Sequence, residues 1–219
     1  MEGRVVSPTA SVSAALDRVL DFIDKSPLKH EIAKAREEFF AELDPSLISD
    51  DIAGFALLLF QDWFLFERPL EGLGITPVKA FYREFSPALS PEEDVLFFGL
   101  TQTVYGVFRL KRIRSSSVVL ASLVDKKVFS VFDPVPEGFR TENYISARLV
   151  DAGDKHLFCP AVCFHPKSQA ENIRRWIEQL KGTAELTRFL LDLAYVNLKT
   201  KLYPEVDPDL FYRELFREG

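Results

Sequence analysis

Four potential metal ligands lie in the ten-residue segment HLFCPAVCFH: His156, Cys159, Cys163 and His165. Imidazole nitrogen and thiolate sulfur are ligands that zinc prefers. The segment reads as a β-strand, however, and at about 3.3 Å per residue the two histidines would lie about 30 Å apart and the two cysteines about 13 Å apart. We therefore expect neither a metal nor a cofactor, and we interpret both cysteines as small buried hydrophobic side chains.

A basic stretch, FRLKRIRSSS, combines Arg109, Lys111, Arg112 and Arg114 with three hydroxyls. Strand alternation predicts Arg109 and Lys111 on one face and Arg112 and Arg114 on the other. Either face could follow phosphates, with Tyr105 near enough to stack on a base. About two phosphate contacts per face would bind nucleic acid weakly at physiological salt. The alternatives are a solvated strand end and a site for acidic side chains, within the chain or on a protein partner.

The segment QDWFLFERPL places three aromatic rings beside an ion pair and a proline. Helical spacing puts Trp63 and Phe66 on one face, and Pro69 must end the helix. Because the helix is apolar around most of its circumference, we interpret it as a core helix, with a partner-binding face as the alternative. We expect Trp63 to be mostly buried, and Glu67 or Arg68 to pair with another element.

Recognisable catalytic motifs are missing from the sequence. It contains no G-x-S-x-G, no H-E-x-x-H and no phosphate-binding loop of the G-x-x-x-x-G-K-[ST] type. The three histidines are the only side chains whose unperturbed pKa suits a base at neutral pH. We assign no catalytic residues, and an unassigned hydrolase stays as an alternative.

The elements that position these residues follow from a change in periodicity. Apolar residues recur at helical spacing up to about residue 102, in short alternating runs over residues 103–166, and at helical spacing again over residues 167–219. Five helix starts pair a capping residue with proline. They are Ser26-Pro27, Asp44-Pro45, Thr76-Pro77, Ser90-Pro91 and Asp207-Pro208. The sequence predicts an α+β fold: an N-terminal helical region, a five-strand antiparallel small barrel or curled sheet, and C-terminal helices.

Charge is unevenly distributed along the chain. Residues 1–100 hold 9 Lys and Arg against 18 Asp and Glu, a net charge of −9, whereas residues 101–160 hold 9 against 6, a net charge of +3. A polyanion site should therefore lie in the middle of the chain. The longest apolar run, residues 52–60, is too short to span a bilayer, which needs about 20 residues. With no segment resembling a signal peptide and two closely spaced cysteines, we expect a cytoplasmic protein without membrane contact.

The segments DWFLFERPLEGLGITPVKAFYRE, LSPEE, ARLV and PAVCFHP together resemble a family of uncharacterised bacterial proteins. The shared pattern is an aromatic WF-x-F helix, an acidic-basic-Pro turn, G-x-TP and a small β unit, and it covers residues 55–166. The resemblance implies this domain layout and brings no established activity. The basic stretch at residues 109–114 and the paired cysteines lie outside the shared pattern.

Together these observations predict a cytoplasmic binding or adaptor protein with a protein partner. The first alternative is a nucleic-acid-binding barrel that uses the basic strand, and the second is the hydrolase.

Overall fold

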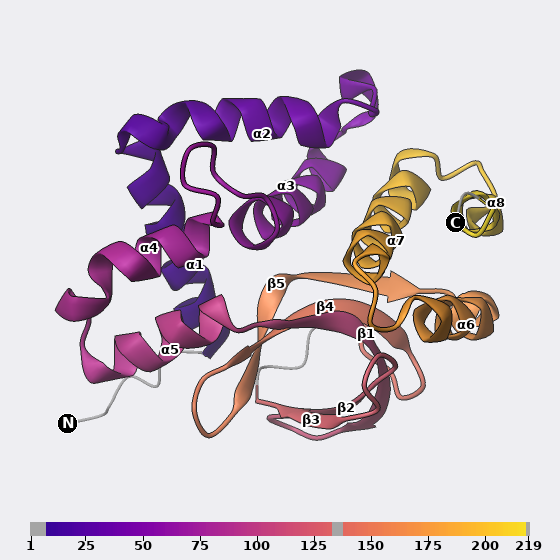
Figure 1. The fold of residues 1–219 in the computed structure, drawn as a ribbon. Coiled ribbons are helices and arrows are strands. Elements are labelled where there is room, and N and C mark those ends of the chain that lie inside the picture. Colours follow the sequence, from indigo (N-terminus) through magenta and orange to yellow (C-terminus); the bar gives the residue numbers. More distant parts are fainter. Residues whose placement is uncertain (1–7, 133–137, 218–219) are drawn as a thin grey trace. The chain divides into compact units, whose positions relative to one another are not determined.

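The chain is an α+β protein with helices before and after a five-stranded sheet (Figure 1). The structure is a computed structural model that describes residues 8–132 and 138–217. Within these ranges, no helix combines the length and the apolar character needed to cross a bilayer. The N-terminal helices are α1 (Pro8–Asp24), α2 (His30–Phe40), α3 (Asp50–Phe66), α4 (Pro77–Phe85) and α5 (Pro91–Thr101). The strands are β1 (Val104–Ile113), β2 (Val118–Ser122), β3 (Val128–Val131), β4 (Tyr144–Asp151) and β5 (His156–His165). The C-terminal helices are α6 (Ala170–Leu180), α7 (Glu185–Leu202) and α8 (Pro208–Leu215).

Side-chain caps fix several of the predicted helix starts. At α5 the Ser90 hydroxyl accepts from the Glu93 amide, and the Glu93 carboxylate accepts from the Ser90 amide, which is the predicted capping box. Ser26 and Asp44 also cap, but each begins a short 3₁₀ turn, Pro27–Lys29 and Pro45–Leu47, and not an α-helix. The capping signals therefore predicted where a helical segment begins, but not whether it is an α-helix or a 3₁₀ turn.

The five strands close into a barrel in the order β1-β2-β3-β5-β4. β1 pairs antiparallel with β2, and β2 pairs antiparallel with β3. Backbone hydrogen bonds from Leu110 to Glu142 and Asn143 place the segment that leads into β4 beside β1. Strand direction cannot alternate all the way around a closed ring with an odd number of strands, so at least one neighbouring pair is parallel. The prediction of a purely antiparallel sheet is therefore wrong: the sheet is mixed.

Two compact units share the chain. Unit 1 contains Met1–Thr103 and Leu149–Ala161, and unit 2 contains Val104–Arg148 and Val162–Gly219. The sequence suggested three consecutive segments, 1–102, 103–166 and 167–219. The structure groups the tip of the β4–β5 hairpin, Leu149–Ala161, with the N-terminal helices, and the remaining strand segments with the C-terminal helices.

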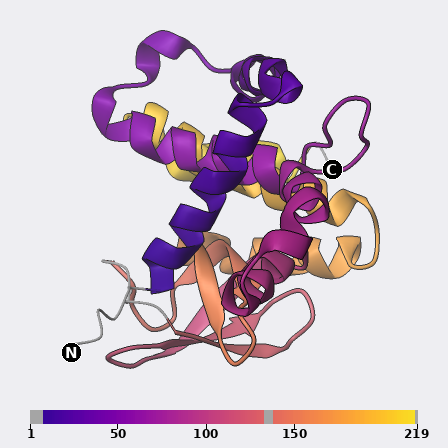
Figure 2. The ribbon, with the colours of Figure 1, turned by 90° about the vertical axis from the view of Figure 1, so that its left-hand side faces the viewer.

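In unit 1, crossed helices enclose a core rich in phenylalanine. Helix α1 lies against α2, α3 and α4, and Figure 2 shows it crossing α3 steeply. Phe60 and Phe64 of α3 are almost fully buried, and the hairpin adds Val150 and Leu157 to the same cluster. The approach of α5 to the hairpin requires glycine at position 99, because a Cβ there would lie 1.9 Å from the carbonyl oxygen of Asp151.

In unit 2, helices α6, α7 and α8 cover the first half of β1. Their cluster surrounds Val107 of β1, and it includes Ile173, Leu193 and Tyr212, one from each helix. The Trp176 ring of α6 stacks against two further aromatic rings of the same cluster. The outer side of β1 is therefore buried at its beginning, which leaves its second half for the basic residues.

Candidate functional site

A β-bulge decides which way the basic residues of β1 face. Arg109 pairs with Ala121 and Leu110 with Leu120, but the next residue in register is Arg112, opposite Val119. Lys111 is therefore the extra residue of a bulge, and every side chain after it changes face. The predicted alternation was wrong for this reason: Arg109 shares its face with Arg112, and not with Lys111.

The resulting outer surface of β1, β2 and β3 is called here the basic face. It consists of two rows across the strands, and its members are Arg109, Ala121 and Val128 in one row and Arg112, Val119 and Ser130 in the other. The opposite rows point into the barrel, where Leu110, Leu120 and Val131 are fully buried. Lys111 in the bulge and Arg114 in the following turn border the basic face, and both are exposed. Cations and apolar side chains thus lie together on one surface.

The charges of the basic face are not equivalent. Arg109 donates from Nε to the Glu142 carboxylate at 2.8 Å, and its Nη2 contacts the same oxygen. This hydrogen bond raises the pKa of Arg109, so the guanidinium stays charged but is already paired. Lys111, Arg112 and Arg114 extend further along the strand and the turn. Val128, which is 65% exposed, supplies the largest apolar contribution to the face.

Tyr105 does not belong to the basic face, although the sequence placed it there. Its hydroxyl donates to the carbonyl oxygen of Leu190 in α7 at 3.1 Å. The guanidinium of Arg148, which is itself buried, lies 4.4 Å from the centre of its ring. Tyr105 therefore anchors helix α7 to β1, and its ring is already covered by a cation where a base was predicted to stack.

A buried polar chain links β4, β5, α7 and α8. His165 contacts the Ser146 hydroxyl through Nε2 and the Tyr212 hydroxyl through Nδ1, the second at 2.9 Å. Asn197 donates to the carbonyl oxygen of Phe164 at 2.5 Å. Ser146, His165, Tyr212 and Asn197 are all buried. Such a chain orients the elements that carry it. A movement that separated two partners would leave buried polar groups without hydrogen bonds, which costs free energy.

Serine and histidine are the residue types of a nucleophile and its general base, but Ser146 and His165 both lie in the core. A serine nucleophile needs a base that is oriented by a third group and is open to a substrate. Here Ser146 and His165 are 2% and 4% exposed, and a tyrosine hydroxyl stands where a carboxylate would stabilise a protonated ring. Burial lowers the pKa of His165 to about 4, so the ring is neutral. We interpret the pair as structural, and it lends no support to the hydrolase alternative.

The four potential zinc ligands are spread along β5. Cys159, Cys163 and His165 are buried, and neither of these two cysteines forms a disulfide. In the part of the chain that the structure describes, no three His, Cys, Asp or Glu side chains gather in a manner that could hold a metal ion.

The aromatic segment of α3 ends in a buried ion cluster. Arg68 donates from Nη1 to the Glu31 carboxylate at 2.6 Å and from Nε to Glu38 at 2.6 Å, so it pairs with α2 as predicted. Glu31 also accepts from the backbone amide of Glu71 at 2.9 Å. Glu31 is fully buried and Arg68 is 7% exposed. The cluster therefore fixes α2 against the turn after α3, and we assign it a structural role.

The rings of the same segment differ in burial. Trp63 packs against the edge of the core with most of its surface buried, as predicted, and its ring lies 5.5 Å from the ring of Phe39. Phe66 is also partly buried, whereas Phe64 is completely buried. Neighbouring positions on this helix thus differ more in burial than helical spacing suggested.

Comparisons of the chain with family models, with curated proteins and with solved structures gave no match.

Proposed function

We propose that this is a binding protein, not an enzyme, and that its basic face docks an acidic, partly apolar segment of a protein partner. One observation carries the proposal: exposed cations lie beside the exposed Val128 and two half-buried apolar side chains on the basic face, whereas the Ser146–His165 pair is enclosed in the core. Arginine is enriched at protein interfaces, and apolar side chains of the partner need a surface such as that around Val128.

The charge distribution supports an acidic partner. The residues of unit 2 include 17 Lys and Arg and 13 Asp and Glu, a net charge of +4, whereas unit 1 has 10 and 20, a net charge of −10. A positive patch steers an acidic segment during encounter and disfavours a basic one. The acidic partner thus meets a favourable field at unit 2 and an unfavourable field at unit 1.

Single-stranded nucleic acid is a second candidate. Some five-stranded barrels bind oligonucleotides on the outer face of their second and third strands, and β2 and β3 carry part of the basic face. With Arg109 paired to Glu142, the described part of the chain leaves three cations of this cluster for phosphates: Lys111, Arg112 and Arg114. Three contacts predict a slope of only about −2 for log affinity against log salt, and weak binding at physiological salt. Since Tyr105 is also engaged elsewhere, we place the acidic segment first.

The test is a fluorescence anisotropy titration at about 150 mM salt. The probes are a labelled peptide of alternating acidic and large apolar residues, its Lys-substituted counterpart, and an oligothymidylate of similar length. The variant Arg112→Ser/Arg114→Ser removes two cations of the candidate site. The control Arg174→Ser/Arg175→Ser removes two exposed cations from α6 in the same unit. Val128→Ser tests the apolar contribution.

We expect the acidic peptide to bind and its Lys counterpart not to bind. The variants Arg112→Ser/Arg114→Ser and Val128→Ser should each weaken binding roughly fivefold or more, which corresponds to about 1 kcal/mol, and the α6 control should change it by less than about twofold. Tight oligothymidylate binding that Arg112→Ser/Arg114→Ser abolishes would replace this proposal by the nucleic-acid candidate. If neither probe binds, or if the α6 control is equally damaging, the basic face is not the docking site.

A further inference from the structure

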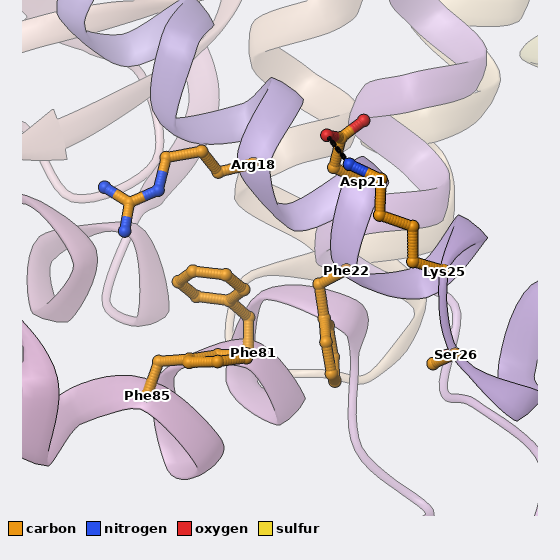
Figure 3. Close-up of a pocket in the computed structure, with 7 residues that line it drawn as sticks. All are labelled: Arg18, Asp21, Phe22, Lys25, Ser26, Phe81 and Phe85. Carbon is orange, nitrogen blue, oxygen red and sulfur yellow. Dashed lines mark hydrogen bonds and ion pairs between the residues drawn. The ribbon is translucent and has the colours of Figure 1, made fainter.

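Unit 1 contains an open cavity between α1 and α4 that the proposed function does not use. Its volume is about 380 Å³, and Figure 3 shows the side chains around it. The lining residues are Arg18, Asp21, Phe22, Lys25, Ser26, Phe81 and Phe85. Ligand cavities usually measure about 300–1,000 Å³. This cavity is therefore large enough for a molecule of one or two rings and too small for a folded partner.

Three phenylalanine rings make the apolar part of the cavity. The ring of Phe22 packs edge-on against those of Phe81 and Phe85, with ring centres 5.8 Å and 5.4 Å apart. The ring centres of Phe81 and Phe85 lie 4.8 Å apart. Phe81 is almost fully buried, whereas Phe85 is 37% exposed. A planar ring that binds here would gain offset or edge-to-face contacts in addition to the burial of apolar area. The walls therefore favour an aromatic ligand.

Two cations stand on opposite sides of the rings. In Figure 3 the Arg18 guanidinium lies on one side of the aromatic group, and the Lys25–Asp21 pair lies on the other. Arg18 uses Nη1 for Glu93 at 2.5 Å, and a guanidinium has five N–H donors in all. Lys25 contacts Asp21 through its Nζ at 2.6 Å, and an ammonium has three donors. Glu93 and Asp21 balance the two positive charges, so what the lining offers an anionic group is the remaining N–H donors of Arg18 and Lys25.

We propose that this cavity binds a small amphipathic aromatic anion, a flat ring system with a carboxylate or sulfonate. The ring lies against Phe22 and Phe85, and the anionic group accepts hydrogen bonds from Arg18 or Lys25. A cationic ligand is disfavoured, because Arg18 already lies over the Phe81 and Phe97 rings, at 5.8 and 4.9 Å from their centres. The site lies in unit 1, whereas the basic face lies in unit 2.

Two naphthalene dyes separate the apolar contribution from the charge. Anilinonaphthalenesulfonate is an aromatic anion of suitable size, and phenylnaphthylamine has the same rings without the sulfonate. Fluorescence titration gives the affinity of each dye for the full chain. Phe85→Ala removes a ring of the cavity, and Lys25→Gln removes a charge that is 72% exposed in its side chain. Phe98→Ala is the matched control, because Phe98 is a 52% exposed ring of unit 1 outside the cavity lining.

We expect the sulfonate dye to bind at one site and more tightly than the neutral dye. Phe85→Ala should weaken both dyes roughly fivefold or more, Lys25→Gln should weaken the sulfonate dye alone, and Phe98→Ala should leave both within about twofold. Circular dichroism in the near ultraviolet checks that each variant keeps its packing, since partly unfolded proteins also bind such dyes. Equal affinity for the two dyes, no binding of the sulfonate dye, or equal losses for Phe98→Ala and Phe85→Ala would each overturn the proposal.

Discussion

Replacing Arg68 by methionine should destabilise the protein strongly, because it removes the cation of a buried ion cluster. Glu31, its partner at 2.6 Å, is fully buried, so in the described part of the chain the variant leaves this carboxylate in the core with the Glu71 amide as its hydrogen-bond donor and His30 Nε2 3.8 Å away. Removing one partner of a buried ion pair typically costs about 3–5 kcal/mol. For a chain of this length each 1 kcal/mol lowers Tm by about 2–4 °C, so we expect a fall of about 6–20 °C.

The same reasoning predicts that a second substitution restores part of the loss. In Arg68→Met/Glu31→Gln the buried group is neutral, and its carbonyl oxygen can still accept from the Glu71 amide. A buried neutral amide with an unsatisfied donor costs about 1–3 kcal/mol, which is less than an unpaired buried charge. The double variant should therefore be more stable than Arg68→Met alone. The exposed Arg83→Met in α4 is the control, and it should change stability by no more than about 0.5 kcal/mol.

Chemical denaturation followed by circular dichroism, with scanning calorimetry as a second measurement, gives the free energies and Tm values. A double variant that is no more stable than Arg68→Met would show that the loss comes from packing of the arginine side chain, and not from the uncompensated charge. A small loss in Arg68→Met would show that water or another cation reaches Glu31.

Two further predictions concern close packing and pH. Gly99→Ala should lower the free energy of unfolding by about 1–3 kcal/mol, because the new Cβ overpacks against Asp151. Gly54→Ala should leave the free energy of unfolding unchanged or raise it by up to about 1 kcal/mol, because no atom outside its own helix backbone lies within 4 Å of the new Cβ. Urea denaturation of the two variants measures both changes. The depressed pKa of His165 means that the unfolded chain binds a proton from about pH 6.5 downward, but the native protein does so only near pH 4. His165 should therefore remove up to about 3 kcal/mol of stability between pH 6.5 and pH 4. The difference between the pH profiles of the natural protein and of His165→Gln isolates this loss, and parallel profiles would contradict it.

Local signals in the sequence predicted the helices and strands well. The change from helical to alternating spacing near residue 103 gave the five strands, and the Ser90 capping box placed the start of α5. These features depend on residues at most a few positions apart. The parallel pairing did not follow from the sequence, because an open curled sheet of five strands can be wholly antiparallel and only the closed ring requires a parallel pair.

The polar clusters could not be predicted in this way. Arg68 and Glu31 are separated by 37 residues, and Tyr212 and His165 by 47. Each residue type alone suits a surface position, and only the packing of distant elements brings the partners together. The contact of Tyr105 could not be predicted for the same reason, because its partner Leu190 lies 85 residues away in α7.

The bulge at Lys111 shows how the basic face and the barrel interior are made compatible. In a regular strand Arg112 would share the inward face with Leu110, and Ile113 would point outward. Because Lys111 takes no partner on β2, Arg112 faces outward opposite Val119, and Ile113 returns to the inner row opposite Val118, which is buried. The spacing of three between Leu110 and Ile113 is the sequence signal for this arrangement, because two inward residues of a regular strand are separated by an even number. One extra residue thus gives the strand an unbroken apolar interior and a cationic exterior, and the proposed docking site depends on both.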